Sequence, residues 1–352
     1  MEEKKKTARE IIEGYDGPPV RIMEVCGTHT HEIFRLGIRK LLPEQVELIS
    51  GPGCPVCVTQ VGFIDEAIYL ALERQVTICT FGDLVRVPGT NMSLAGAREK
   101  GAKIRIVYSP VDAKEYAKEH PKEQVTFLSV GFETTTPSAC LSVKKAREEG
   151  LTNYSILTAN KTMPQAYEAL KGSADIFLYP GHVNAITGTK LCEELAKEGV
   201  SGVVAGFTAK ELLTALAVAL ARFQEGRPFF VNCYPRVVTE NGSPQAQKLV
   251  EEMMEPCDSE WRGLGVIKGS GMRLQEEWSV FDARKKYKIP PIQGKANPAC
   301  RCGDVLQGKC KPSDCKVFGK VCTPQHPVGA CMVSGEGACS AYYMYGEAEK
   351  MK

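Results

Sequence analysis

Short runs of apolar, mostly β-branched residues alternate with amphipathic stretches between residues 20 and 230. Within each run the apolar residues are continuous, so both faces of the predicted strands are expected to be buried. Strands of this kind separated by helices are typical of a parallel sheet. The predicted strands are 20–25, 46–50, 76–81, 104–108, 125–130, 154–157, 176–179 and 203–207, and the clearest helices are 60–73, 137–149 and 209–223.

The α/β pattern is too long for one small domain. A polar stretch at 112–124, with three Lys-Glu steps and the pair His120-Pro121, is typical of a joint between two units. After residue 228 the pattern becomes irregular, with a short strand, one helix and glycine-rich turns. We therefore expect an α/β fold with two parallel-sheet domains around a cleft, over 19–120 and 121–225, and a smaller irregular domain over 226–352.

Composition and charge narrow the function. The 352 residues are 43% hydrophobic and 24% charged, as in ordinary globular proteins. The net charge is +2 and no long basic run follows Lys4 to Lys6, so neither nucleic acid nor an anionic membrane is an expected partner. No apolar stretch approaches the ~20 residues of a membrane span, and no signal segment follows the first charges, so a cytoplasmic location is expected. Without a Walker A motif or a GxGxxG turn, nucleotide turnover is not expected.

Seven of the 15 cysteines lie in the last 53 residues, among prolines and glycines that cannot close a core. In a reduced compartment such density favours a metal or an iron–sulfur cluster over disulfides. Structural zinc is the main competitor, although its sites usually combine two close pairs. A radical adenosylmethionine enzyme is disfavoured because no Cys-x3-Cys-x2-Cys run occurs. The seven thiols are Cys300, Cys302, Cys310, Cys315, Cys322, Cys331 and Cys339.

Two cysteine motifs follow the first two predicted strands. Cys26 is followed closely by His29 and His31, and a helix that begins at Thr28 or Thr30 would favour its thiolate. Gly51-Pro52-Gly53-Cys54-Pro55-Val56-Cys57 follows the next strand, and its spacing suits a shared metal or a reversible disulfide. Because ligands of open α/β sheets bind at strand carboxyl ends, three thiols are expected to converge there. The alternatives are a buried structural Cys26, surface histidines and two idle thiols.

Two further strand ends carry polar side chains. Glu133 lies in Gly131-Phe132-Glu133-Thr134-Thr135, between a strand and a helix. A capped helix start explains Thr136 and Pro137 but not Glu133. His182 lies in Pro180-Gly181-His182-Val183 and is equally consistent with a base or a packed loop residue.

In combination these motifs resemble the HypD family of hydrogenase maturation factors. The resemblance rests on the four motifs above and on the tail segments Cys315-Lys316-Val317-Phe318-Gly319, Cys322-Thr323-Pro324 and Met332-Val333-Ser334, which together span residues 26–334. It implies two similar α/β domains beside a domain that carries a [4Fe-4S] cluster.

The resemblance also implies a function. HypD-like proteins, with a small HypC-like chaperone, are the scaffold on which iron acquires two cyanides and one carbon monoxide, and a HypE-like protein donates the cyanide. Cys26 then matches the position that holds iron, and Cys54 and Cys57 match a redox pair. We also expect His29, His31, Glu133 and His182 to be catalytic residues, with one of the first two binding the Cys26 thiol or taking its proton. The expected cluster ligands are Cys302, Cys315, Cys322 and Cys339, with Cys331 as first reserve. The alternatives are an iron–sulfur thiol oxidoreductase that carries no iron cargo, and a zinc-stapled interaction protein.

Overall fold

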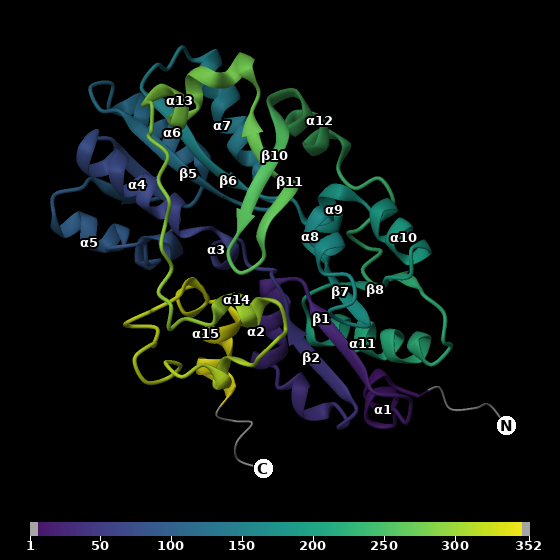
Figure 1. The fold of residues 1–352 in the computed structure, drawn as a ribbon. Helices are drawn as coiled ribbons and strands as arrows, with labels where there is room; N and C mark the ends of the chain where they lie inside the picture. Colours follow the sequence, from purple (N-terminus) through teal and green to yellow (C-terminus); the bar gives the residue numbers. More distant parts are fainter. Residues whose placement is uncertain (1–5, 347–352) are drawn as a thin grey trace.

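Two parallel β-sheets form the frame of the molecule, which we describe from a computed structural model covering residues 6–346 (Figure 1). Most of the N-terminal charged run, residues 1–5, lies outside this range. The parallel sheets and the helices between their strands confirm the expected α/β class. The first sheet has the order β2 (Val46–Ser50), β1 (Val20–Glu24), β7 (Ile176–Pro180), β8 (Ser201–Ala205) and β9 (Phe230–Asn232). The second has the order β4 (Ile104–Ile106), β3 (Thr77–Thr80), β5 (Val125–Gly131) and β6 (Tyr154–Asn160).

The strands pair as their continuous apolar runs predict. Every residue of β3, β5, β6, β7 and β8 is buried. Only a parallel sheet with both faces covered buries whole strands in this way. The register places Glu24 of β1 opposite Ser50 of β2, so the chain leaves both strands at the same edge of the sheet.

Helices cover both sheets. Those that follow strands of the first sheet are α2 (Gly27–Arg35), α3 (Pro55–Val58), α9 (Gly181–Thr187), α10 (Lys190–Lys197) and α11 (Ala209–Phe223), preceded by α1 (Ala8–Glu13). Those associated with the second sheet are α4 (Val61–Glu73), α5 (Leu94–Glu99), α6 (Pro110–Glu119), α7 (Thr136–Glu148), α12 (Pro244–Met253) and α13 (Ala283–Lys286). Helix α8 (Met163–Ala169) follows β6 but packs on β7 of the first sheet through Tyr167. The tail adds α14 (Cys302–Leu306) and α15 (Ala338–Tyr345), and 3-10 turns are η1 (Ile38–Leu41), η2 (Gly82–Arg86), η3 (Glu276–Phe281), η4 (Pro312–Asp314) and η5 (Ala330–Met332).

The two sheets do not follow the linear division expected at residues 120 and 121. That boundary falls between β4 and β5, which both belong to the second sheet. Strand β7 instead returns to pair with β1, and β8 pairs with β7. Strand β9, expected in the third unit, extends the same sheet beyond β8. The chain therefore crosses from the first sheet to the second and back again. Hydrogen bonding between distant strands decides this membership, and the local pattern does not contain it.

An antiparallel hairpin, β10 (Met254–Trp261) and β11 (Gly265–Leu274), occupies a region that the pattern left irregular. Between its two buried end residues, β10 alternates between partly buried and exposed residues, as in a ribbon with one face on the protein. Its turn contains Gly263 at φ +84°, a conformation that glycine adopts without strain. The hairpin turn points toward α3 and α14 (Figure 1).

The cysteine-rich tail packs beside α2 at the lower edge of the molecule (Figure 1). One apolar core contains Met23 and Ile49 of the first sheet, Leu128 of the second, and Leu306 of the tail. The tail thus shares a core with both sheets and is not an appendage. Within residues 6–346, every helix is too short or too polar to cross a bilayer.

Candidate functional site

The polar motifs gather where the strand order of each sheet reverses. In the first sheet β2 lies on one side of β1, and the later strands β7, β8 and β9 lie on the other. In the second sheet the reversal falls between β3 and β5. Ligands of open α/β sheets bind outside the carboxyl ends of the strands at such switch points. The motifs at Cys26, Glu133 and His182 all follow strands that border one of these points.

Cys26 is the N-cap residue of α2, with φ −148° and ψ 124°. The helix therefore begins at Gly27, one residue before the earlier of the two expected starts, Thr28 and Thr30. The N–H groups of His29 and Thr28 face the sulfur and favour its thiolate. Burial dominates, however, and together with the nearby Glu336 carboxylate it raises the pKa of Cys26 to about 12. The free thiolate expected from the helix start is therefore wrong for the metal-free protein, in which Cys26 is a thiol.

The Cys54 loop lies directly against Cys26. The N–H of Gly27 donates to the carbonyl oxygen of Gly53 at 3.0 Å. A Cβ on Gly53 would lie 2.2 Å from the Cys26 nitrogen, so only glycine allows this approach. Cys54 in turn caps α3, and its sulfur accepts the N–H of Cys57 at 3.3 Å. The structure thus brings the Cys26 and Cys54 motifs together, as their strand ends predict.

A tail loop at residues 334–336 closes over both switch points. The Thr28 hydroxyl donates to Glu336 at 2.6 Å, and the Ser334 hydroxyl donates to Asp83 at 3.0 Å. Thr28 belongs to the first sheet's edge, and Asp83 follows β3 of the second. His31 lies with this loop, its Nδ1 3.0 Å from the carbonyl oxygen of Gly335, and not with the Cys26 sulfur. The position of Glu336 beside Cys26 was not predictable from spacing, because 310 residues of chain separate the two.

His29 and His182 both pack against one aromatic ring, that of Phe207. The Phe207 ring centroid is 4.7 Å from that of His29 and 4.0 Å from that of His182. His29 is fully buried, with Nε2 3.0 Å from the Gly206 carbonyl oxygen and Nδ1 lacking a hydrogen-bond partner. Burial lowers the pKa of His29 to about 4, so the ring is neutral at pH 7 and Nδ1 is a free acceptor. Burial also lowers the pKa of His182, which favours its neutral form.

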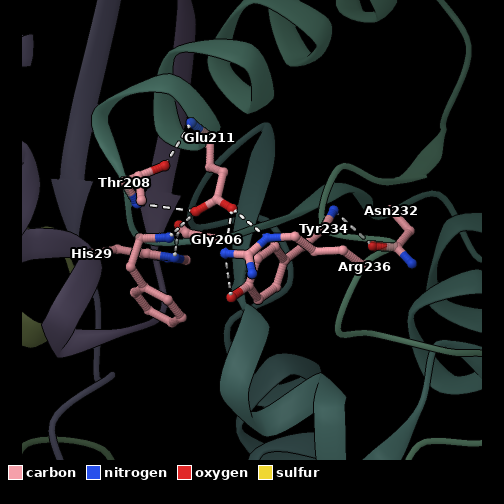
Figure 2. Close-up of polar contacts among 8 residues, drawn as sticks. His29, Gly206, Thr208, Glu211, Asn232, Tyr234 and Arg236 are labelled. Carbon is pink, nitrogen blue, oxygen red and sulfur yellow. Dashed lines mark hydrogen bonds and ion pairs between the residues drawn. The ribbon is translucent and has the colours of Figure 1, made fainter.

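Glu211 holds the loop that carries Gly206 and Phe207 (Figure 2). Its Oε2 accepts the N–H groups of Phe207 at 3.0 Å and Thr208 at 3.1 Å, while Arg236 donates to Oε1 at 2.8 Å. Burial by itself would raise the pKa of Glu211, but the hydrogen bonds from Thr208 and Arg236 lower it to about 2. Sequence reasoning missed this carboxylate, although the spacing Thr208-x-x-Glu211 is that of a capping box.

Glu133 faces the start of α8. Its Oε1 accepts the N–H of Met163 at 2.8 Å, and its Oε2 is sealed from solvent without a partner, although the residue as a whole is only partly buried. Burial raises the pKa of Glu133 to about 7, against the opposing effect of the Met163 hydrogen bond. Glu133 therefore binds the N-terminus of α8. This contact accounts for Glu133, which the capping of the helix after residue 135 did not explain.

Five tail thiols lie close to one another and to Cys57. The sulfurs of Cys302 and Cys331 are 2.7 Å apart. Cys331 also contacts Cys57 and Cys339, while Cys300 contacts Cys302. Cys322 lies within electrostatic reach of Cys300 and Cys339. In the part of the chain that the structure describes, no three His, Cys, Asp or Glu side chains are arranged to hold a single metal ion.

Cys315 lies at the edge of this group. Its thiol points to the carbonyl oxygen of Ala299 at 3.8 Å, next to Cys300, and it interacts electrostatically with Cys310. Of the four expected cluster ligands, Cys302, Cys322 and Cys339 therefore lie inside the group and Cys315 beside it. Cys300 was not among the expected ligands, and Cys331, the reserve, is central.

Comparison with known proteins identifies the family. Residues 2–346 match the family model HypD, described as "Hydrogenase formation hypA family". The chain is 42% identical over 347 residues to the hydrogenase maturation factor HypD of Cupriavidus necator, covering 95% of this chain and 92% of that protein. It is 43% identical over 339 residues to HypD of Escherichia coli, with 94% and 90% covered, and 44% identical over 340 residues to HypD of Rhodobacter capsulatus, also with 94% and 90% covered. The chain therefore belongs to the HypD family of hydrogenase maturation factors.

Proposed function

We propose that this protein is the scaffold on which an iron atom receives two cyanides and one carbon monoxide before delivery to a [NiFe]-hydrogenase, with Cys26 as the anchor of the iron. The observation that carries the proposal is the place of Cys26: a helix N-cap at a sheet switch point, with Cys54 and Glu336 packed against the adjoining Gly27. A HypC-like chaperone as partner and a HypE-like cyanide donor belong to the same proposal.

The surroundings of Cys26 suit this cargo. Iron with cyanide ligands binds best to soft thiolate donors in a site that excludes water. Because burial raises the pKa of Cys26 to about 12, iron binding must release the thiol proton. The N–H groups of Thr28 and His29 then stabilise the thiolate that remains. The neutral His29 and His182 add no positive charge that would compete with the metal.

The tail thiols fit a [4Fe-4S] cluster as donor set. The sulfurs of Cys302 and Cys331 are 2.7 Å apart, not far above the S–S bond length of about 2.0 Å. This distance is too short for ligands at two corners of a cluster, and it favours a dithiol pair. The thiols left around them would hold the cluster, namely Cys300, Cys315, Cys322 and Cys339. A bound cluster supplies single electrons. This assignment keeps three of the four ligands expected from the sequence and replaces Cys302 with Cys300.

The contact between Cys57 and Cys331 supports thiol redox chemistry beside the scaffold role. Burial raises the pKa of the Cys57 thiol well above its ordinary value, so Cys57 is protonated until it is oxidised or bound. The two pairs, Cys54 with Cys57 and Cys302 with Cys331, share this contact and can exchange a disulfide through it. The same contact is what a thiol oxidoreductase without iron cargo would need, so that alternative stays open.

Infrared spectroscopy separates the two functions. Wild type and Cys26→Ser, each purified anaerobically with the HypC-like partner, are compared in the cyanide and carbonyl stretching region. We expect the bands in wild type only, because a serine oxygen is a poor anchor for soft iron. The matched control is Cys233→Ser, which changes a thiol in β9's neighbourhood away from the site. Full bands in Cys26→Ser would contradict the anchor, and their absence from wild type would favour the oxidoreductase.

A further inference from the structure

The turn of the β10–β11 hairpin is inserted between the Cys54–Cys57 segment and the tail. Thr59, two residues after Cys57, forms a bridge with Trp261. On the other side Gly263 packs on Gly303 of α14 so closely that a Cβ on Gly263 would lie 2.2 Å from the Gly303 Cα. Gln307 also donates to the Gly263 carbonyl oxygen. The hairpin turn thus contacts both thiol-bearing segments.

Arg262 is the charged residue of this turn. Its backbone N–H donates to the Val58 carbonyl oxygen at 2.8 Å, and its Nε donates to the Thr59 carbonyl oxygen at 3.0 Å. These bonds fix the guanidinium on the segment that follows Cys57. Among residues 6–346 no carboxylate forms an ion pair with Arg262, in contrast to the neighbouring arginines 273 and 284.

One nitrogen of this guanidinium lacks an acceptor. Nη2 of Arg262 is buried and has no hydrogen-bond partner. A buried charged donor without an acceptor is costly, because it has lost its hydration and gained nothing in return. An open cavity of about 490 Å³ lies beside Arg262 and Lys295. A ligand in this cavity could not readily accept a hydrogen bond from Nη2 of Arg262, because Nη2 is sealed from solvent. Arg262 lines this cavity together with Asn297 and Pro298, so the hairpin turn lies beside the segment that leads to Cys300.

We propose that Nη2 of Arg262 donates a hydrogen bond to the thiolate of Cys300 or to an adjoining sulfide of the tail cluster, and that Arg262 thereby raises the reduction potential of this cluster. The inference rests on the proposed function, because it requires a [4Fe-4S] cluster in the tail. Reduction adds one electron to the cluster and makes it more negative. A fixed cation beside it stabilises the reduced form more than the oxidised form. Arg262 is a positioning residue, joined by its other bonds to the loop of Cys57.

The test is an anaerobic redox titration of the full-length protein, with dithionite as electron donor and electron paramagnetic resonance as readout. Iron and sulfide are measured first in each sample. Arg262→Gln should keep the cluster, and at the wild-type midpoint its ratio of reduced to oxidised cluster should fall about tenfold, equivalent to about 59 mV for one electron. Arg262→Lys keeps the charge without the planar fork and should fall between the two. Lys295→Gln, a cation of the same cavity, should match wild type.

Two results would overturn the inference. A ratio within twofold of wild type in Arg262→Gln, with iron and sulfide retained, would show that Arg262 does not act on the cluster. If Arg262→Gln fails to assemble the cluster, the test passes to Arg262→Lys. A reduction potential of Arg262→Lys equal to that of Lys295→Gln would then also show that Arg262 does not act on the cluster. A wild-type protein without iron and sulfide would overturn the proposed cofactor as well, which distinguishes the two failures.

Discussion

Glu211 offers the sharpest test of how the site is held together. It joins three elements: the loop of Gly206 and Phe207, the start of α11, and Arg236 after β9 (Figure 2). Glu211→Gln keeps the shape and removes the charge. We expect the loop under His29 and His182 to loosen while the rest of the fold persists.

The magnitude follows from the pKa of Glu211. Lowering it from an ordinary 4.5 to about 2 corresponds to about 3 kcal/mol of stabilisation at neutral pH. Glu211 is only 18% exposed, but its partner Arg236 is 65% exposed, and solvent screens that part. We therefore expect a loss of about 2 kcal/mol in Glu211→Gln. Since the folded-state pKa is depressed, the stabilisation is fully present above pH 4.5 and is lost as pH falls toward 2.

Hydrogen exchange measures this loss locally. At pH 7 the amides of Phe207 and Thr208 should exchange about 30-fold faster in Glu211→Gln, since every 1.4 kcal/mol is a factor of ten. The difference should be the same at pH 5 and shrink below pH 4.5. The control is Glu255→Gln, whose carboxylate pairs with Arg273 at 2.8 Å on an exposed surface and should change little. Equal exchange in the two variants at pH 7, or a difference that grows in acid, would refute the reasoning.

Three further predictions concern residues around the site. Arg39→Met should lower the free energy of unfolding in guanidinium by about 3–5 kcal/mol, because it leaves the fully buried carboxylate of Glu24 without its ion-pair partner. The control Arg35→Met breaks an exposed pair with Glu32 and should cost under about 1 kcal/mol. Equal losses of stability in the two variants would contradict this prediction. The pKa of Glu133 is raised in the folded protein, so wild type loses stability as the pH rises from 4.5 to 7. Glu133→Gln lacks this titration, and its stability relative to wild type should therefore increase over the same range, by at most about 3 kcal/mol. A stability difference that stays constant from pH 5 to pH 8 would count against this prediction. Thiol trapping should find Cys54 and Cys57 bridged at oxidising potentials, and their double Ser variant should retain cluster iron and sulfide; trapping no bridge at any potential would make them ligands or spectators.

Sequence reasoning succeeded where the cause was local. The strand runs and the helix that begins after Cys26 depend on residues that are close together in the chain. Parallel strands release their loops at one edge, so the meeting of the Cys26 and Cys54 motifs followed from strand order alone. The family resemblance, confirmed by the comparisons, rested on these same motifs.

Tertiary structure decided everything that depends on segments distant in the chain. Which sheet β7 joins is set by its pairing with β1, and the local pattern of β7 suits either sheet. The thiol state of Cys26 depends on burial beneath a tail loop, and this desolvation outweighs the helix N-terminus that the sequence displays. The roles of Arg262 and Glu211 depend likewise on acceptors and donors from other elements. Sequence spacing specifies what a residue can do, whereas packing across the two sheets and the tail determines which partner, charge and solvent access it meets.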